Sequence, residues 1–243
     1  MLRLSTCSLS RSPLQGALVA TVNNVPLRLN RLKVNKLKPY HHGNLREALL
    51  VAAIRLIGEV GPTAFTLREV ARRAGVSHNA PYRHFRDKED LMAAVATEGY
   101  RELTAAMVHA ADKQFRALDR LKHAGLAYIE FALRRPEYFT VMFDAPYSGR
   151  SHFHSLDAAK QAFSALVGFV KCAQDEGQLA SGDPVEFAYL AWTMVHGVAK
   201  LAITHRLPYR TRGAVLKFAS FVIDQSLPIR HQQGPDRSLA ETQ

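Results

Sequence analysis

The segment Thr66–Lys88 reads TLREVARRAGVSHNAPYRHFRDK, and the interpretation of the whole chain starts from it. Thr66 and Glu69 form a T-x-x-E capping box, which marks the beginning of a helix. Apolar residues at helical spacing follow, and Gly75 supplies the backbone freedom that the end of a helix needs. The first half of the segment is therefore predicted to be a short helix that ends in a tight turn.

A second short helix is predicted after the turn, from Ser77 as its N-cap to about Phe85. Ala71 is small enough for the two helices to approach closely, and Val76 and Phe85 are expected to anchor the second helix. Pro81 falls in the first turn of this helix, where its missing N–H removes few bonds. Two short helices joined in this way are typical of a helix-turn-helix, whose outward-facing residues can enter the major groove of DNA.

The polar residues of the segment suit a nucleic acid, since it contains six Lys or Arg and two acidic residues. Backbone N–H groups at a helix N-terminus favour phosphate, and Asn is a natural partner of adenine. Phosphate donors are predicted at Thr66, Tyr82, His84 and Lys88, and base contacts at His78 and Asn79. Tyr82 and His84 could instead pack between helices. Arg72 and Arg73 are interpreted as solvent-facing residues of the first helix.

Residues 1–100 divide into two parts. Residues 1–39 contain turn-forming residues and basic residues, and they are predicted to be a disordered extension. Three interpretations stay open: a basic arm that contacts phosphate, an organelle transit peptide, or a mis-annotated start. Residues 40–100 are predicted to form the DNA-binding domain. Its first helix is expected to begin after Asn44, an N-cap, and to end at Gly61-Pro62.

The chain after this segment is predicted to be helical throughout. Asp87 caps a long helix, and the predicted helices are 88–113, 116–135, 136–143, 154–176, 184–206 and 208–226. Residues 101–227 are assigned to a ligand-binding and dimerisation domain, and residues 228–243 to a disordered tail. The fold class is all-α: an N-terminal three-helix helix-turn-helix domain and a larger C-terminal helical domain.

The composition limits the classes of protein to which the chain can belong. Its 243 residues are enough for two domains, and the formal net charge is +11. Residues 1–46 contain eight Lys or Arg and no acidic residue, so much of the excess lies there. A positive balance favours polyanions but does not separate DNA, RNA and membrane surfaces. No stretch of about 18 apolar residues predicts a transmembrane helix. Cys7 and Cys172 lie far apart without metal-binding spacing, so no disulfide framework is indicated and a reducing cytoplasm is expected. A protein bound to DNA there would be associated with the nucleoid.

Residues 43–102 resemble the TetR family of regulators. The resemblance rests on Thr66, on the A-x-x-x-G-V turn of Ala71, Gly75 and Val76, and on the YRHFRDK ending from Tyr82 to Lys88. One branch of the family has a Trp-His-Gly motif in its C-terminal domain. Segments that resemble this branch are WTMVHG at 192–197, YHHGNLR at 40–46 and the stretch from Glu137 to Phe143.

The resemblance implies a homodimer in which the last two helices of each subunit form a four-helix bundle. Each third helix would enter a major groove of a palindromic operator in double-stranded DNA. Most members are repressors that a ligand releases, so a repressor with an apolar or aromatic small-molecule effector is predicted. The resemblance implies phosphate contacts from Thr66, Arg68, Tyr82, His84 and Lys88, and base-facing positions for His78, Asn79 and Ala80. The predicted DNA-binding set also contains Ser77 and Arg83.

Aromatic residues of the larger domain are candidates for the effector pocket, since such pockets have apolar walls with few polar groups. The candidates are Tyr128, Phe131, Tyr138, Phe139, Met142, Phe143, Phe163, Trp192 and His196. Aromatic residues at helical spacing are also typical of a core. For Trp192 and His196, one helical turn apart, packing with a hydrogen-bonded histidine is the favoured interpretation. Gly197 would then allow a close approach of helices.

No catalytic, metal or cofactor site is predicted. The chain has no Gly-rich phosphate loop after a strand, no nucleophile elbow and no H-E-x-x-H motif. The pairs His41-His42 and His152-x-His154 lack carboxylate or Cys partners at ligand spacing. An all-helical enzyme and a ligand-independent architectural DNA-binding protein are the alternatives to a sequence-specific regulator.

Overall fold

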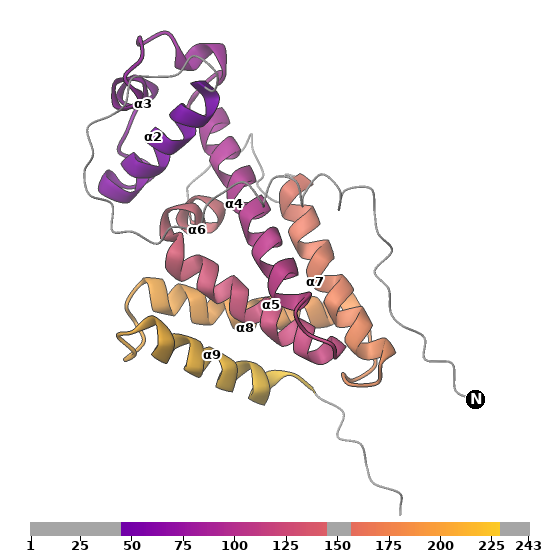
Figure 1. Cartoon of the computed structure of the whole chain (residues 1–243). Coiled ribbons are helices and arrows are strands. Elements are labelled where there is room, and N and C mark those ends of the chain that lie inside the picture. Colours follow the sequence, from indigo (N-terminus) through magenta and orange to yellow (C-terminus); the bar gives the residue numbers. More distant parts are fainter. Residues whose placement is uncertain (1–44, 145–156, 229–243) are drawn as a thin grey trace, which may run out of the picture. The chain divides into compact units, whose positions relative to one another are not determined.

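The computed structural model describes residues 45–144 and 157–228, and its elements in these ranges are helices (Figure 1). In chain order they are α2 (Leu45–Val60), α3 (Leu67–Ala74), the 3₁₀ helix η1 (Pro81–Arg83), α4 (Lys88–Ala111), α5 (Ala117–Arg134), α6 (Pro136–Phe143), α7 (Asp157–Asp175), α8 (Pro184–Ile203) and α9 (Arg212–Ser226). The all-α prediction is confirmed. The predictions for residues 1–39, for Asn44 and for the tail beyond Pro228 fall outside the described residues.

The described helices belong to two compact units. The first lies within Met1–Ala105 and Arg134–Ala162, and the second within Ala106–Leu133 and Phe163–Gln243. In the first unit, α6 packs on α2, and a Cβ atom added at Gly58 would lie 3.2 Å from the side chain of Glu137. The functional division near residue 100 stays a prediction, and the structure adds that α6 packs with the helix-turn-helix.

Both ends of α3 follow from the local sequence. The Thr66 hydroxyl accepts a hydrogen bond from the Glu69 N–H at 3.3 Å, and the Glu69 carboxylate accepts one from the Thr66 N–H at 2.7 Å. At the other end Gly75 is left-handed, with φ of 72°, and the Val76 N–H donates to the carbonyl of Ala71. The predicted capping box and glycine C-cap are confirmed.

The predicted α-helix from Ser77 to Phe85 is wrong. The Ala80 N–H donates to the carbonyl of Ser77 in a turn, and only residues 81–83 are helical, as the 3₁₀ helix η1. The reason is Pro81, which has no N–H to donate to the preceding turn, so α-helical bonding cannot run through it. We call residues 77–85 the reading turn.

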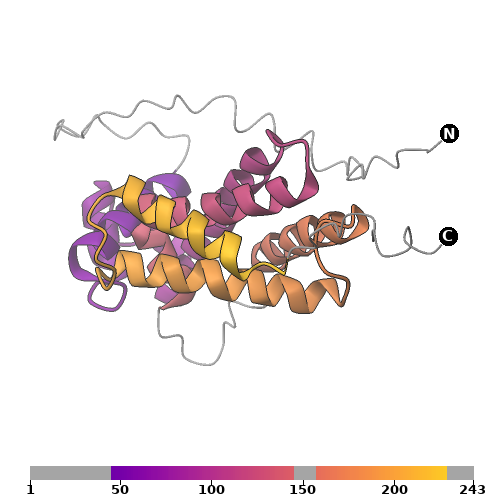
Figure 2. The same ribbon diagram turned by 90° about the horizontal axis from the view of Figure 1, so that it is seen from below.

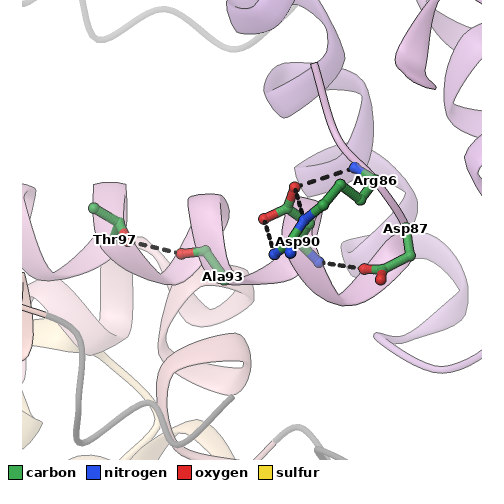
Figure 3. A network of polar contacts seen from close by, with 5 residues as sticks. All are labelled: Arg86, Asp87, Asp90, Ala93 and Thr97. Carbon is green, nitrogen blue, oxygen red and sulfur yellow. Dashed lines mark hydrogen bonds and ion pairs between the residues drawn. The ribbon is translucent and has the colours of Figure 1, made fainter. Parts of the chain in front are cut away.

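The N-terminus of α4 is capped as the sequence predicts (Figure 3). The Asp87 carboxylate accepts a hydrogen bond from the Asp90 N–H at 2.8 Å, and the Asp90 carboxylate accepts one from the Arg86 N–H at 3.1 Å. The side chain of Arg86 also pairs with Asp90 at 3.4 Å. One turn further along, the Thr97 hydroxyl donates to the carbonyl of Ala93 at 2.8 Å. Arg86 and Asp87, the two residues between the reading turn and α4, are therefore hydrogen-bonded to the first turn of α4.

The later helices lie close to their predicted positions, with one exception. The N-cap Asp183 of α8 accepts the Val185 N–H at 2.8 Å, as expected for Asp before a Pro at the first helical position. Helix α9, predicted from residue 208, begins at Arg212. The Thr211 hydroxyl caps it by accepting the Ala214 N–H, a local signal that the sequence analysis overlooked.

The second unit is built on close contacts among three helices. Helices α8 and α9 pack on each other, and Figures 1 and 2 both show them side by side. A Cβ atom added at Gly125 of α5 would lie 3.2 Å from Val195 of α8 and 3.3 Å from Ile223 of α9. The absence of a side chain at Gly125 therefore lets α5 approach both helices.

Candidate nucleic-acid interface and effector site

The predicted DNA-binding residues share one property in the structure. All except Ala80 and Lys88 are exposed, whereas several apolar residues between them are buried. We call the exposed group the reading surface; it consists of Thr66, Arg68, Ser77, His78, Asn79, Tyr82, Arg83 and His84. The residues beneath it include Leu67, Val70, Ala71 and Phe85, none more than 6% exposed. The first unit therefore has a polar surface over a packed apolar interior.

Ala80 differs from the other predicted base-facing residues. Its side chain is buried, at 9% exposure, whereas His78 and Asn79 are exposed. A buried methyl group does not reach a base edge, so the candidates for base contacts are reduced to His78 and Asn79.

Thr66 is already engaged in the free protein. Its N–H and its hydroxyl both donate to the Glu69 carboxylate, at 2.7 Å and 3.0 Å. A phosphate bound at the N-terminus of α3 would therefore compete with this carboxylate for the same donors.

Lys88, also predicted to bind phosphate, is half-buried. Its ammonium group donates to the carbonyl oxygens of Thr63 and Phe65, both at 2.8 Å. Burial lowers the pKa of Lys88 below its ordinary value, and the charge of Glu69 opposes this shift.

Arg73 is not the solvent-facing residue that the sequence analysis expected. It forms two hydrogen bonds with the Glu59 carboxylate, at 2.6 Å and 2.5 Å, and so joins α3 to α2. These bonds hold the pKa of Glu59 below its ordinary value. Arg72, in contrast, is exposed as predicted.

The structure brings to the reading turn one cation that the sequence analysis did not assign. Arg46, in the first turn of α2, is exposed, and its guanidinium lies 5.6 Å from the centroid of the Phe85 ring. Its position on a separate helix gave no local signal. Only the packing of α2 against the reading turn shows that Arg46 borders this surface.

The predicted effector residues separate into two groups. Tyr138, Phe139, Met142 and Phe143 belong to the first unit, and Tyr128, Phe131, Phe163, Trp192 and His196 belong to the second. We call the first group the α6 cluster and the second group the α8 cluster.

The α6 cluster contacts α4, and its members are buried except for Phe143, which is half-buried. The Phe143 ring lies 5.8 Å from Tyr100 and 4.8 Å from Phe139, and the Tyr100 hydroxyl donates to the carbonyl of Met142 at 3.4 Å. Burial raises the pKa of Tyr100 to about 12. A Cβ atom added at Gly99 would lie 2.6 Å from the sulfur of Met142. Tyr100 and Gly99, on α4, were not among the predicted residues because they are distant in sequence.

The α8 cluster contains a chain of hydrogen bonds among aromatic rings. The Trp192 Nε1–H donates to the Tyr128 hydroxyl at 3.2 Å, and that hydroxyl shares a hydrogen bond with His196 Nδ1 at 2.8 Å. The predicted hydrogen-bonded histidine is confirmed. Phe163 lies 4.6 Å from Tyr189, which the sequence analysis missed although it lies one turn before Trp192. Phe131, the remaining candidate, is buried on α5.

Neither a metal-binding group of side chains nor a membrane-spanning helix is found among the described residues. They contain no group of three or more His, Cys, Asp or Glu residues that could hold a metal ion. The helices that the structure describes include none long and apolar enough to cross a membrane.

Two sequence models of known families match the chain. The model described as bacterial regulatory proteins of the tetR family matches residues 49–95, which contain α3 and the reading turn. The model of a tetracyclin repressor-like C-terminal domain matches residues 121–225, which contain the α8 cluster. The two matches cover separate parts of the chain in the order that the resemblance predicts.

Individual proteins share part of the sequence or the fold with this chain. An HTH-type transcriptional repressor of Mycobacterium tuberculosis is 41% identical over 76 residues, which are 30% of this chain and 40% of the relative. A protein of unknown function from Rhodococcus sp. RHA1 is 34% identical with a TM-score of 0.67, over 79% of this chain and 100% of that one. The regulator FadR of Bacillus subtilis, solved with stearoyl-CoA, is 15% identical with a TM-score of 0.65, over 76% and 99% of the two chains. That last likeness concerns the fold.

Proposed function

Because this chain belongs to the TetR family of bacterial regulatory proteins, we propose that it is a sequence-specific DNA-binding repressor that a small molecule releases from a palindromic operator. The observation that carries this proposal is the reading surface. Its donors are exposed over a packed interior, and they lie on a helix-turn-helix of the kind that family members use. The relatives are named as transcriptional regulators, which bind DNA and do not catalyse reactions.

The proposed contacts divide by type. Thr66, Arg68, Tyr82, Arg83 and His84 contact phosphate oxygens and set the position of the protein on the duplex. His78 and Asn79, at the start of the reading turn, contact base edges, together with the neighbouring hydroxyl of Ser77. Arg46 borders the same surface and adds positive charge near the phosphates.

A homodimer is supported by the apolar residues that α8 and α9 leave exposed. Of the large hydrophobic side chains, Leu190, Leu201 and Phe221 are 44%, 45% and 60% exposed. Such residues on adjacent helices are typical of a surface that a partner covers. In the proposed dimer this surface meets its own copy, and two reading surfaces then face the two halves of an operator. The segment from Trp192 to Gly197 also favours the Trp-His-Gly branch of the family.

The effector response is proposed to act through α6. This helix contacts α2 at Gly58 and α4 at Gly99, and both helices support the reading surface. An apolar or aromatic effector that favours another position of α6 would change the placement of the reading surface and lower the affinity for the operator. The aromatic side chains of each cluster, taken by itself, suit such a ligand. The cytoplasm is the proposed location.

The test is the selection of genomic DNA fragments by the purified protein at about physiological salt, which is about 0.15 M, followed by sequencing. We expect a palindromic site, and we expect the Asn79→Ala variant to select sites with a different base preference. Binding to random fragments only, or an unchanged preference in Asn79→Ala, would contradict the proposed base readout. Small molecules related to the products of neighbouring genes can then be tested for release.

A further inference from the structure

Two arginines outside the predicted DNA-binding set lie at the end of the reading turn. Arg86 directly follows Phe85, the last residue of the turn, and its side chain is 85% exposed. Arg46 belongs to α2, and its guanidinium lies 5.6 Å from the centroid of the Phe85 ring. The Phe85 ring is only 2% exposed, so its packing fixes the end of the turn beside which both cations lie. We call Arg46 and Arg86 the arginine pair.

Arg86 is oriented by a carboxylate of α4 (Figure 3). The Arg86 N–H donates to the Asp90 carboxylate at 3.1 Å, and the side-chain Nη2 and Nε atoms lie 3.4 Å and 3.5 Å from it. The Arg86 N–H lowers the pKa of Asp90 most, and the side chain of Arg86 and the charge of Arg46 lower it further. A second carboxylate, that of Asp87, lies near Arg86 and accepts the Asp90 N–H at 2.8 Å. Both carboxylates are therefore hydrogen-bonded within the first turn of α4.

Both guanidinium groups keep hydrogen-bond donors for a ligand. A guanidinium has five N–H donors, and Arg86 directs two of its side-chain nitrogens toward Asp90. These two distances exceed the length of about 2.7–2.9 Å that is usual for a strong charged pair. The side chain of Arg46 forms neither a hydrogen bond nor an ion pair with another described residue. Exposed guanidinium groups of this kind match the oxygens of a phosphate, which they can bind through two N–H groups at once.

The surroundings of the arginine pair favour the DNA backbone as the ligand. Residues 70–86 contain four Arg and no Asp or Glu, so positive charge continues from α3 through the reading turn. Arg83 and His84, both exposed and proposed above to contact phosphate, directly precede Phe85. We propose that Arg46 and Arg86 each bind a phosphate of the same DNA duplex that the reading surface contacts. The proposal rests on the proposed function and extends its interface onto α2 and the residue before Asp87.

The first measurement is the salt dependence of binding, by the full chain, to a duplex that carries the selected site. Each phosphate contact contributes about 0.9 to the magnitude of the slope of log K against log salt concentration. Arg46→Gln and Arg86→Gln should therefore each lower this magnitude by about 0.9, and the double variant should lower it by about 1.8. The base preference should stay that of the wild type, because phosphate contacts carry no sequence information.

Two arginines of the same helices provide a matched control. Arg55 is exposed on α2, about two and a half turns after Arg46, so it lies on the opposite face of that helix. Arg101 of α4 is 66% exposed and pairs with Glu98 at 3.7 Å. The double variant Arg55→Gln and Arg101→Gln removes the same charge and should leave the slope close to that of the wild type. If replacing the arginine pair lowers the slope no more than this control does, the proposal is overturned.

A second readout separates phosphate binding from a purely structural role of Arg46 against Phe85. The Gln variants should have nearly the Tm of the wild type, because exposed ion pairs contribute little to stability. Arg46→Lys and Arg86→Lys keep the cation and should restore most of the slope. A lowered Tm with an unchanged slope would assign the arginine pair to stability alone and overturn the proposal, as would Lys variants whose slopes stay as low as those of the Gln variants.

The same slopes can be measured on a duplex of random sequence, because contacts with the backbone do not depend on sequence. If the wild type selects no palindromic site, the proposed function fails, and the slopes on the random duplex still decide the role of the arginine pair. If the wild type selects such a site and the double variant keeps the full slope, the proposed function stands and the proposal for the arginine pair fails.

Discussion

The reading surface and the α8 cluster contain the same residue types in opposite surroundings. Tyr82 and His84 are exposed, and the Tyr82 side chain is 52% exposed. Tyr128 is 4% exposed, and its hydroxyl is hydrogen-bonded to both Trp192 and His196. A tyrosine and a histidine can therefore serve as donors to a ligand in one unit and as an internal polar network in the other.

This difference shows what assigns a role to a polar side chain. A buried hydroxyl must be hydrogen-bonded within the protein, because leaving it unsatisfied costs free energy. An exposed hydroxyl is hydrogen-bonded to water, which a phosphate oxygen can replace at little cost. The comparison predicts that substitutions in the clusters change stability and that substitutions on the reading surface change DNA binding.

The largest effect on stability is expected from the α6 cluster. Phe139 is fully buried, so Phe139→Ala should lower the free energy of unfolding by about 3–5 kcal/mol, through lost burial and the cavity left behind. Urea denaturation measures this change. Phe115→Ala is the control, because the Phe115 side chain is completely exposed. Similar losses of unfolding free energy in the two variants would show that burial of the side chain does not cause the effect of Phe139→Ala.

Tyr128 of the α8 cluster and Tyr82 of the reading surface give the most direct test of the comparison. Tyr128→Phe removes the oxygen that Trp192 and His196 contact and should cost about 1–3 kcal/mol of stability, with the hydrogen bonds lost in the interior. Tyr82→Phe should leave stability unchanged and weaken binding to all DNA sequences. Thermal unfolding and DNA binding, measured on both variants, would contradict the comparison if the two effects were exchanged.

Gly197 tests whether the surface of α8 is covered in the dimer. Apart from its chain neighbours and the backbone of its own helix, no heavy atom of the described residues lies within 4 Å of a Cβ atom added there, unlike at Gly99 and Gly125. A methyl group should favour the helix of a free subunit by about 1 kcal/mol. In the proposed dimer, overpacking by the same methyl group should cost about 1–3 kcal/mol. We therefore expect Gly197→Ala to weaken the dimer in sedimentation experiments, and an unchanged dimer with a higher Tm would place Gly197 outside the interface.

The smallest effect is expected where the reading turn meets α4. The hydrogen bond from the Arg86 N–H holds the pKa of Asp90 below its ordinary value. The hydrogen bond and the charge of the Arg86 side chain lower this pKa further. The stabilisation is therefore present above the ordinary carboxyl pKa and is lost as the pH falls through the lowered pKa of Asp90. At pH 7, Asp90→Asn should cost about 0.3–1 kcal/mol, as for a carboxylate at a helix N-terminus. Tm measured against pH should show this difference shrink in acid.

Glu102 serves as a control for Asp90, because its pKa is shifted in the opposite direction. Burial raises the pKa of Glu102 above its ordinary value, although Arg135 pairs with it at 3.2 Å. Its contribution is fully present below the ordinary carboxyl pKa and is lost as the pH rises through the raised value. Glu102→Gln should therefore raise the Tm at pH 7 and lose this advantage in acid. A parallel pH dependence of the two variants would contradict the assigned shifts.

Local sequence was sufficient wherever a feature depends on neighbouring residues. Thr66, Glu69 and Gly75 fixed both ends of α3, and Asp87 fixed the beginning of α4, because caps form between residues a few positions apart. The same reasoning failed at Pro81, where the predicted α-helix is a turn and a 3₁₀ helix. The missing N–H of Pro81 was expected to remove few bonds, but α-helical bonding does not run through this residue.

The sequence by itself determined the all-helical fold, the helix-turn-helix and the family. These rest on periodicity, caps and a motif of adjacent residues. Only the tertiary structure decided that Lys88 binds the α2–α3 connection, that Arg73 joins Glu59, and that the aromatic candidates form two separate clusters. Such contacts depend on which distant segments pack together, and burial and partners, rather than residue type, then decide whether a polar group is available to a ligand.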